Sequence, residues 1–280
     1  MKILRKPEWL KIQLPTTTEY KTLNSLISKG NLHTICTSGK CPNMGECWAN
    51  GTATFMILGD ICTRGCKFCN VTTGKPLPPD DNEPQQIVDA VAQLRLKHVV
   101  ITSVDRDDLS DGGAAHWATT INKLRESNPS ITIETLIPDF DAKTDLLNIV
   151  AVSRPDIISH NLETVERLTP LVRSKAQYRT SLKTLAYLAN QGLTTKSGIM
   201  LGLGETFDEI LATMDDLLAV ECRIMTMGQY LRPSLKNLPV DRYVSPAEFD
   251  ELKEIALKKG FKFVESGPLV RSSYHAEKHI

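Results

Sequence analysis

The chain has no excess of charge of either sign, because its 33 Lys and Arg residues balance 33 Asp and Glu residues. A neutral chain gives no electrostatic reason to expect nucleic acid or a membrane as the main partner. No apolar run approaches the length of about 18 residues that a membrane-spanning helix needs. Residues 1–14 lack the apolar stretch of a secretory signal and are short for a transit peptide. We therefore expect a cytosolic, and in this sense cytoplasmic, protein.

Cysteine is nearly absent outside one short region. Six of the seven cysteines lie between Cys36 and Cys69, and the seventh is Cys222. An odd count and tight clustering in an apparently cytosolic chain argue against a disulfide framework. Clustered thiols in a reducing compartment are more often metal ligands, whereas the isolated Cys222 is expected to be a small buried hydrophobic residue.

The rest of the sequence predicts an α/β fold. After the cysteines and a Pro-rich connection over 75–84, short β-branched runs alternate with segments of helical period. Six such units predict a parallel sheet, because parallel strands need helical crossovers, and we expect a partial TIM-like (β/α)6 barrel. The predicted strands are 53–58, 98–103, 131–137, 156–160, 195–201 and 224–231.

Three predicted helices have clear start or stop signals. Residues 245–248 offer a capping box with proline at the first helical position, and Gly260 suits the end of that helix. A second capping box lies at 206–209, and a third helix covers 177–191 before Gly192.

Cys62, Cys66 and Cys69 form the pattern Cys-x3-Cys-x2-Cys in the loop after the first predicted strand. Three thiolates in so short a loop suit a [4Fe–4S] cluster, in which each binds a different iron and the fourth iron stays open. Gly65 permits the tight turn that such a loop needs. A zinc site with a remote fourth ligand is the alternative that the spacing leaves open.

A second triplet precedes the first. Cys36, Cys41 and Cys47 form Cys-x4-Cys-x5-Cys in a segment that Pro42 and Gly45 mark as an irregular loop. By itself the pattern predicts another three-ligand metal site, which is either structural or redox-active.

The first triplet, with Phe68 before its last cysteine, resembles the signature of the radical S-adenosylmethionine (SAM) superfamily. The resemblance implies that the open iron binds the amino and carboxylate groups of SAM, whose reductive cleavage yields a 5′-deoxyadenosyl radical. The two triplets in this order resemble the lipoyl synthase family. Two further motifs, 6–11 (Lys-Pro-Glu-Trp-Leu-Lys) and 271–276 (Arg-Ser-Ser-Tyr-His-Ala), extend this resemblance over essentially the whole chain.

The second resemblance implies two [4Fe–4S] clusters. The later triplet holds the catalytic cluster, and the earlier triplet holds an auxiliary cluster that is the sulfur donor. Ser272 is then the fourth ligand of the auxiliary cluster, with adjacent Ser273 as the alternative. An alkoxide is harder than a thiolate and matches iron–sulfur chemistry less well, so it could leave when the cluster is dismantled.

The implied reaction inserts sulfur at C6 and C8 of an octanoyl group amide-linked to lysine. The implied partners are octanoylated lipoyl carrier domains, in 2-oxoacid dehydrogenase subunits or the glycine cleavage carrier protein, and a ferredoxin or flavodoxin reductant. Another two-cluster radical SAM enzyme, biotin-synthase-like or a methylthiotransferase, is the enzymatic alternative. A zinc-stabilised binding protein is the alternative without catalysis.

SAM needs contacts besides iron. Asp105, at the end of the second predicted strand, is the candidate for the methionine amino group. Asn161 and Glu163 follow the fourth strand and suit the ribose hydroxyls, and Arg173 suits the SAM carboxylate. Each has a structural alternative, in a solvated loop for Asp105 and in the packing for the others, and the role of His160 stays open.

These patterns divide the chain into three segments. We expect an N-terminal extension with the auxiliary motif (1–52), a radical SAM partial barrel (53–235), and a C-terminal helix and extension carrying the Arg-Ser-Ser-Tyr motif (236–280).

Overall fold

The computed structural model describes residues 4–11, 21, 27, 32–49, 54–274 and 276. The chain forms two compact units. The amino-terminal unit comprises 12–64 and 70–158, and the carboxy-terminal unit comprises 1–11, 65–69 and 159–280.

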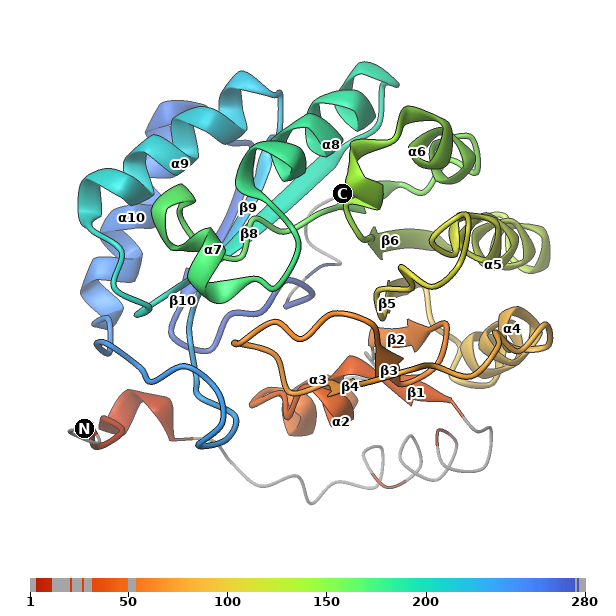
Figure 1. Ribbon diagram of the computed structural model, residues 1–280, viewed down its shortest axis with the longest axis horizontal. Coiled ribbons are helices and arrows are strands. Elements are labelled where there is room, and N and C mark those ends of the chain that lie inside the picture. Colours follow the sequence, from red (N-terminus) through yellow and green to blue (C-terminus); the bar gives the residue numbers. More distant parts are fainter. Residues whose placement is uncertain are drawn as a thin grey trace. The chain divides into compact units, whose positions relative to one another are not determined.

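The amino-terminal unit is built on three parallel strands and one antiparallel strand. Parallel pairing joins β2 to β5 and β5 to β6, while β1 pairs antiparallel with β2. Crossover helices lie along the outer side of these strands (Figure 1). The elements are β1 (His33–Thr34), β2 (Thr54–Ile57), β5 (His98–Ser103), β6 (Thr132–Leu136), α4 (Glu83–Gln93), α5 (Ala114–Ser127), η2 (Phe140–Ala142) and α6 (Thr144–Ala151).

The carboxy-terminal unit contains three parallel strands in the order β8-β9-β10. Helices α8, α9 and α10 pack against them around a continuous apolar core, to which α9 contributes Ile210, Met214 and Leu217. The elements are η1 (Glu8–Leu10), η3 (Glu166–Leu168), α7 (Thr169–Val172), α8 (Tyr178–Asn190), β8 (Thr195–Leu201), α9 (Phe207–Ala219), β9 (Ile224–Gln229), α10 (Pro246–Lys259) and β10 (Phe263–Gly267). Strand β7 (Ile157–Ser159) lies where the two units meet in the sequence.

The predicted helix signals are confirmed. Thr206 and Glu209 form a reciprocal capping box at α9, and the Ser245 side chain caps α10. Helix α10 ends at Gly260, whose φ of 117° is a conformation that glycine adopts readily. Cys222 is fully buried, as expected, and burial raises the pKa of its thiol to about 12.

The predicted strands are present, with β5 and β8 at their expected bounds and the others shorter at one or both ends. Residue 53 of the first predicted strand lies outside the described residues. Strand β10 was not predicted, although it extends the parallel set within the segment expected to be a C-terminal extension. Two short helices, α2 (Ile35–Ser38) and α3 (Met44–Ala49), also lie where an irregular loop was predicted. The Thr34 side chain caps α2 by accepting a hydrogen bond from the Thr37 amide.

Candidate active site

The first half of the Cys-x3-Cys-x2-Cys loop is held by backbone hydrogen bonds within the amino-terminal unit. The loop leaves β2, and Cys62 lies in a short strand, β3 (Ile61–Cys62), which pairs with β4 (Thr72–Thr73). Two backbone N–H groups point at the Cys62 sulfur, from Asp105 at 3.3 Å and from Arg64 at 3.4 Å. Amide donors directed at a ligand sulfur are a recurring feature of iron–sulfur sites, where they help to set the reduction potential.

The second half of the loop is held within the carboxy-terminal unit. The Lys67 amide donates to the Val172 carbonyl at 2.9 Å, and the Lys67 carbonyl accepts from Leu238 at 3.1 Å. The Asn237 side chain donates to the Cys69 carbonyl at 2.8 Å. Thus hydrogen bonds to other segments of the unit fix the backbone at and between Cys66 and Cys69. The role of Asn237 was not predicted from the sequence.

Phe68, which the resemblance to the radical SAM signature makes a candidate cofactor contact, packs within the carboxy-terminal unit. Its ring is partly buried against the apolar core of the carboxy-terminal unit, which includes residues of α8 and α9. This packing fixes the loop between its last two cysteines. A direct contact of Phe68 with SAM remains a prediction.

The second cysteine triplet occupies α2, the following turn and α3. Cys36 is buried, whereas Cys41 and Cys47 are half-buried. Burial, and next the charge of Cys41, raise the pKa of the Cys36 thiol to about 11. Asn70, the residue after Cys69, donates to the Ser38 carbonyl at 2.8 Å and so connects this segment to the end of the other cysteine loop.

Predicted SAM residues at the end of β7 form one polar network. Asn161 donates to a Glu163 carboxylate oxygen at 3.1 Å. Burial raises the pKa of Glu163, while the positive charge of Arg173 opposes that rise. Arg173 donates to the Ser181 hydroxyl at 2.8 Å, and the same oxygen lies 2.8 Å from His160 Nε2. The structure therefore brings Asn161, Glu163 and Arg173 together. His160 contacts the same Ser181 hydroxyl that accepts from Arg173.

Strand β8 packs closely against this network at Gly198, which has no room for a side chain. A Cβ atom there would lie 2.3 Å from Thr226 Oγ1 and 3.2 Å from Asn161 Oδ1. Among the described residues, Asn161 Oδ1 is buried without a hydrogen-bond partner. A buried acceptor of this kind is costly unless something bonds it, which is the situation expected of a ligand contact.

Asp105 lies beside Cys62 in the amino-terminal unit. One of its carboxylate oxygens is 3.8 Å from the Cys62 sulfur, and the other is 3.3 Å from Arg64 Nη1. Its position at the end of β5 is the one that the sequence predicted. Binding of the SAM amino group by Asp105 remains a prediction.

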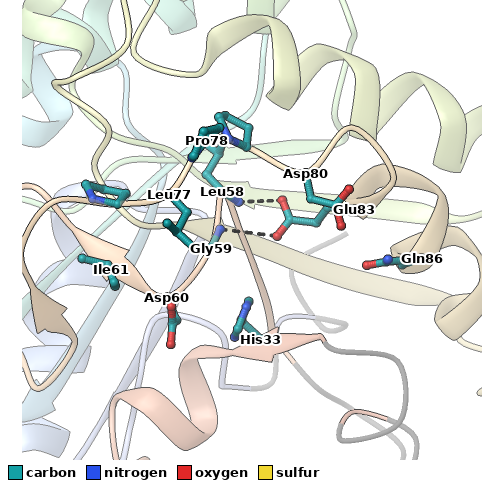
Figure 2. A pocket seen from close by; sticks show the side chains of 12 residues that line it. His33, Leu58, Gly59, Asp60, Ile61, Leu77, Pro78, Asp80, Glu83 and Gln86 are labelled. Atoms are coloured by element: carbon teal, nitrogen blue, oxygen red, sulfur yellow. Dashed lines mark hydrogen bonds between the residues drawn. The ribbon is translucent and has the colours of Figure 1, made fainter.

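Glu83 anchors the start of the cysteine loop. Its carboxylate accepts from the Leu58 amide at 2.6 Å and the Gly59 amide at 3.4 Å, and it pairs with His116 at 2.8 Å. Leu58 has a φ of 67°, a conformation that costs a non-glycine residue free energy. Figure 2 shows the two bonds from the Leu58 and Gly59 amides to Glu83, at the wall of a cavity of about 160 Å³. None of the predicted SAM contacts, Asp105 included, lines this cavity, so the cavity is not the predicted SAM site.

Replacing Glu83 with Ala is expected to lower the free energy of unfolding by about 2–3 kcal/mol, because it removes the charged acceptor of the buried Leu58 amide, of the half-buried Gly59 amide and of His116. Urea denaturation of the full chain measures the change. Gln85→Ala, on the exposed side of the same helix, is the control and should change stability by less than about 0.5 kcal/mol. Equal effects of the two substitutions would show that Glu83 has no special role.

The Arg-Ser-Ser-Tyr motif follows β10 after residues 268–270. Ser272 and Ser273 are half-buried in a turn closed by the bond from the Tyr274 amide to the Arg271 carbonyl, at 2.9 Å. Just before the motif, the Val270 carbonyl crosses β9 at Gly228, where an added Cβ would approach it to 2.1 Å. The position of residue 275 in the motif lies outside the described residues.

Comparison with known proteins places these features in a family. The model of the radical SAM superfamily matches residues 56–217. A curated protein from Treponema denticola named lipoyl synthase is 61% identical over 99% of this chain and 95% of its own length. One of the same name from Phocaeicola vulgatus is 56% identical over 100% of this chain and 99% of its own. The chain belongs to the lipoyl synthase family. It is therefore a radical SAM sulfur-inserting enzyme, with SAM and a [4Fe–4S] cluster as cofactors.

Solved structures show the fold independently. Methylornithine synthase has a TM-score of 0.55 at 11% identity, over 89% of this chain and 82% of that chain. HydG, a maturase of the [FeFe]-hydrogenase, has a TM-score of 0.57 at 13% identity, over 96% of this chain and 65% of that chain. These likenesses confirm the predicted partial TIM-like barrel. Among the described residues, no helix is long and apolar enough to cross a membrane.

The residues present fit the cofactors of the lipoyl synthase family. Three thiols in one loop, with amides directed at Cys62, suit a cluster with one open iron. The buried acceptor of Asn161 beside Glu163 suits a polar ligand. No three His, Cys, Asp or Glu side chains in the described part of the chain converge on a single metal ion. Thiolates that bind different irons of one cubane need not converge in that way.

Proposed function

We propose that this enzyme converts a protein-bound octanoyl-lysine to lipoyl-lysine by inserting sulfur at C6 and C8. The observation that carries the proposal is the identity of 61% over 99% of the chain to a protein named lipoyl synthase. The two cysteine triplets and the Arg-Ser-Ser-Tyr motif support it, because they supply the two sets of ligands that the reaction needs.

Cys62, Cys66 and Cys69 would hold the catalytic cluster, and SAM bound beside it supplies the radical chemistry. This chain's residues would bind and orient SAM. The Asp105 carboxylate accepts from the amino group, while Asn161 and Glu163 accept from the ribose hydroxyls. Arg173, which Ser181 holds in place, pairs with the SAM carboxylate. The buried side chains around β8 exclude water from the reacting groups.

Cys36, Cys41 and Cys47 would hold the auxiliary cluster, which is the sulfur donor, with Ser272 or its neighbour Ser273 as the fourth ligand. The three thiols lie in one short segment, with Cys36 buried and Cys41 and Cys47 half-buried, which supports a shared ligand role. The substrates would be octanoylated carrier domains of 2-oxoacid dehydrogenases or the glycine cleavage carrier protein. Electrons would come from a ferredoxin or flavodoxin, and the enzyme would work in the cytoplasm.

A product assay tests the proposal. The protein is purified without oxygen, loaded with iron and sulfide, and incubated with SAM, dithionite and a peptide that carries octanoyl-lysine. Mass spectrometry should show the peptide gaining two sulfur atoms and losing hydrogen at the two positions. A methylthiolated product, or sulfur insertion only into a free small molecule, would instead indicate another two-cluster radical SAM enzyme. Zinc without acid-labile sulfide would rule out the radical mechanism.

A further inference from the structure

The guanidinium of Arg64 is buried among carboxylates. Its Nε and Nη2 atoms each donate to Asp107 at 2.8 Å, and Nη1 donates to Asp139 at 3.0 Å. Nη1 also lies 3.3 Å from an oxygen of Asp105. A single side chain thus contacts three carboxylates at 3.3 Å or less and that of Asp141 at 4.0 Å, with only 5% of its own surface exposed.

These carboxylates come from the ends of two strands. Asp105 and Asp107 follow β5, and Asp139 follows β6, so Arg64 ties the cysteine loop to both strand ends. A buried ion pair is a poor source of stability, because the desolvation of its charges offsets most of the attraction. Arg64 is better explained by what it positions than by what it contributes to folding.

What it positions is the segment that contacts Cys62. Thr63 donates to the Asp105 carbonyl from its amide at 3.0 Å and from its hydroxyl at 2.9 Å. The Asp107 amide donates back to the Thr63 hydroxyl at 3.1 Å. Arg64 completes this set of bonds, and the result is that the Asp105 amide lies 3.3 Å from the Cys62 sulfur.

The same contacts set the direction of the Asp105 side chain. Its Oδ1 faces Arg64, and its Oδ2 faces the Cys62 sulfur at 3.8 Å. Without Arg64, the Asp105 carboxylate could rotate about its side-chain bonds. The Asp105 amide would also be held less firmly against the Cys62 sulfur, because the guanidinium that binds this segment would be gone.

We propose that Arg64 is a positioning residue for the catalytic site: through Asp105, it fixes one hydrogen bond to the Cys62 sulfur and the direction of one carboxylate beside it. The inference rests on the proposed function in one respect, that Cys62 is a cluster ligand. A guanidinium is suited to this task because its planar donors bond several carboxylates at fixed angles, which a lysine ammonium does not do.

The test uses the anaerobically loaded full-length enzyme in three forms: wild type, Arg64→Met and Arg64→Lys. Three quantities are measured, namely the reduction midpoint of the catalytic cluster followed by electron paramagnetic resonance, the Kd for SAM, and the thermal unfolding midpoint. We expect Arg64→Met to raise the Kd for SAM about tenfold, the size expected when one charge-assisted hydrogen bond is misplaced. It should also shift the reduction midpoint and the resonance spectrum, and Arg64→Lys should restore part of each change.

Arg125→Met is the matched control. Arg125 forms an ion pair with Asp156 at 2.7 Å in the same unit and makes its other bond to the Ile131 carbonyl, outside the cysteine loop. It should change the unfolding midpoint alone. If Arg64→Met likewise lowers only the unfolding midpoint, leaving the Kd and the spectrum of the wild type, Arg64 is merely structural and the inference is wrong.

Should Arg64→Met fail to fold, Arg64→Lys and Asp139→Asn decide the question. Asp139 is buried and bonds Arg64 Nη1, so its amide analogue keeps the shape and weakens the hold on the guanidinium. Wild-type values of Kd and midpoint in both would overturn the inference. A wild-type enzyme that binds no iron–sulfur cluster would contradict the proposed function instead, which separates the two failures.

Discussion

Replacing Cys62, Cys66 and Cys69 together with Ala should lower the iron content from about eight to about four per chain and abolish the reductive cleavage of SAM. The reason is that, in the proposed function, the loop supplies all three protein ligands of the catalytic cluster, so no partial set of thiolates would remain. Iron and acid-labile sulfide analysis measures the first effect. Chromatography of 5′-deoxyadenosine measures the second, in the presence of dithionite and excess SAM.

Cys222→Ala is the matched control for this triple substitution. It removes one thiol that is fully buried in the core and far along the chain from both triplets. The control should keep the wild-type iron content and rate of SAM cleavage. If the triple variant still cleaves SAM, the catalytic cluster is not on these cysteines, and the assignment of the two triplets must be abandoned.

Replacing Cys36, Cys41 and Cys47 with Ala should also remove about four irons per chain, but SAM cleavage should persist. The enzyme should still form 5′-deoxyadenosine from SAM, because the catalytic loop is intact, while lipoyl product falls below detection. The octanoyl peptide assay measures the product, and the same samples give the 5′-deoxyadenosine. The two triple variants therefore separate radical formation from sulfur insertion.

The second prediction fails in a recognisable way. If the variant retains all of its iron, the earlier triplet is not an iron–sulfur site. If it loses iron yet still makes lipoyl product, the sulfur comes from elsewhere, and the auxiliary cluster is not the sulfur donor. A Ser272→Ala variant compared with Ser273→Ala would then show which serine, if either, belongs to the site.

The fold was largely predictable because its elements carry local signals. Thr206 and Ser245 mark helix starts by side-chain bonds to residues three positions later, which sequence spacing reveals directly. Strand β10 was missed because its five residues, Phe263 to Gly267, include Glu265, Ser266 and Gly267 and show neither alternation nor a β-branched run. Its pairing with β9 is a long-range choice that local patterns do not encode.

The site was predictable where chemistry is carried by spacing, as in the cysteine triplets. Arg64 lies between Cys62 and Cys66 and was visible in the sequence, yet its partners Asp107 and Asp139 are more than forty residues away. Glu83, Ser181 and Asn237 were likewise missed. Each acts on backbone or side chains distant in sequence, and nothing in a short motif signals such a partner.

The contact of the Val270 carbonyl with Gly228 changes how the end of the chain should be regarded. Because a side chain at residue 228 would collide with that carbonyl, the route of the last described residues is set by a strand some forty positions earlier. The segment around Val270 is thus part of the packed structure, and it cannot be trimmed without consequence. Engineering of this enzyme is better directed to other surfaces, such as the exposed side of α5.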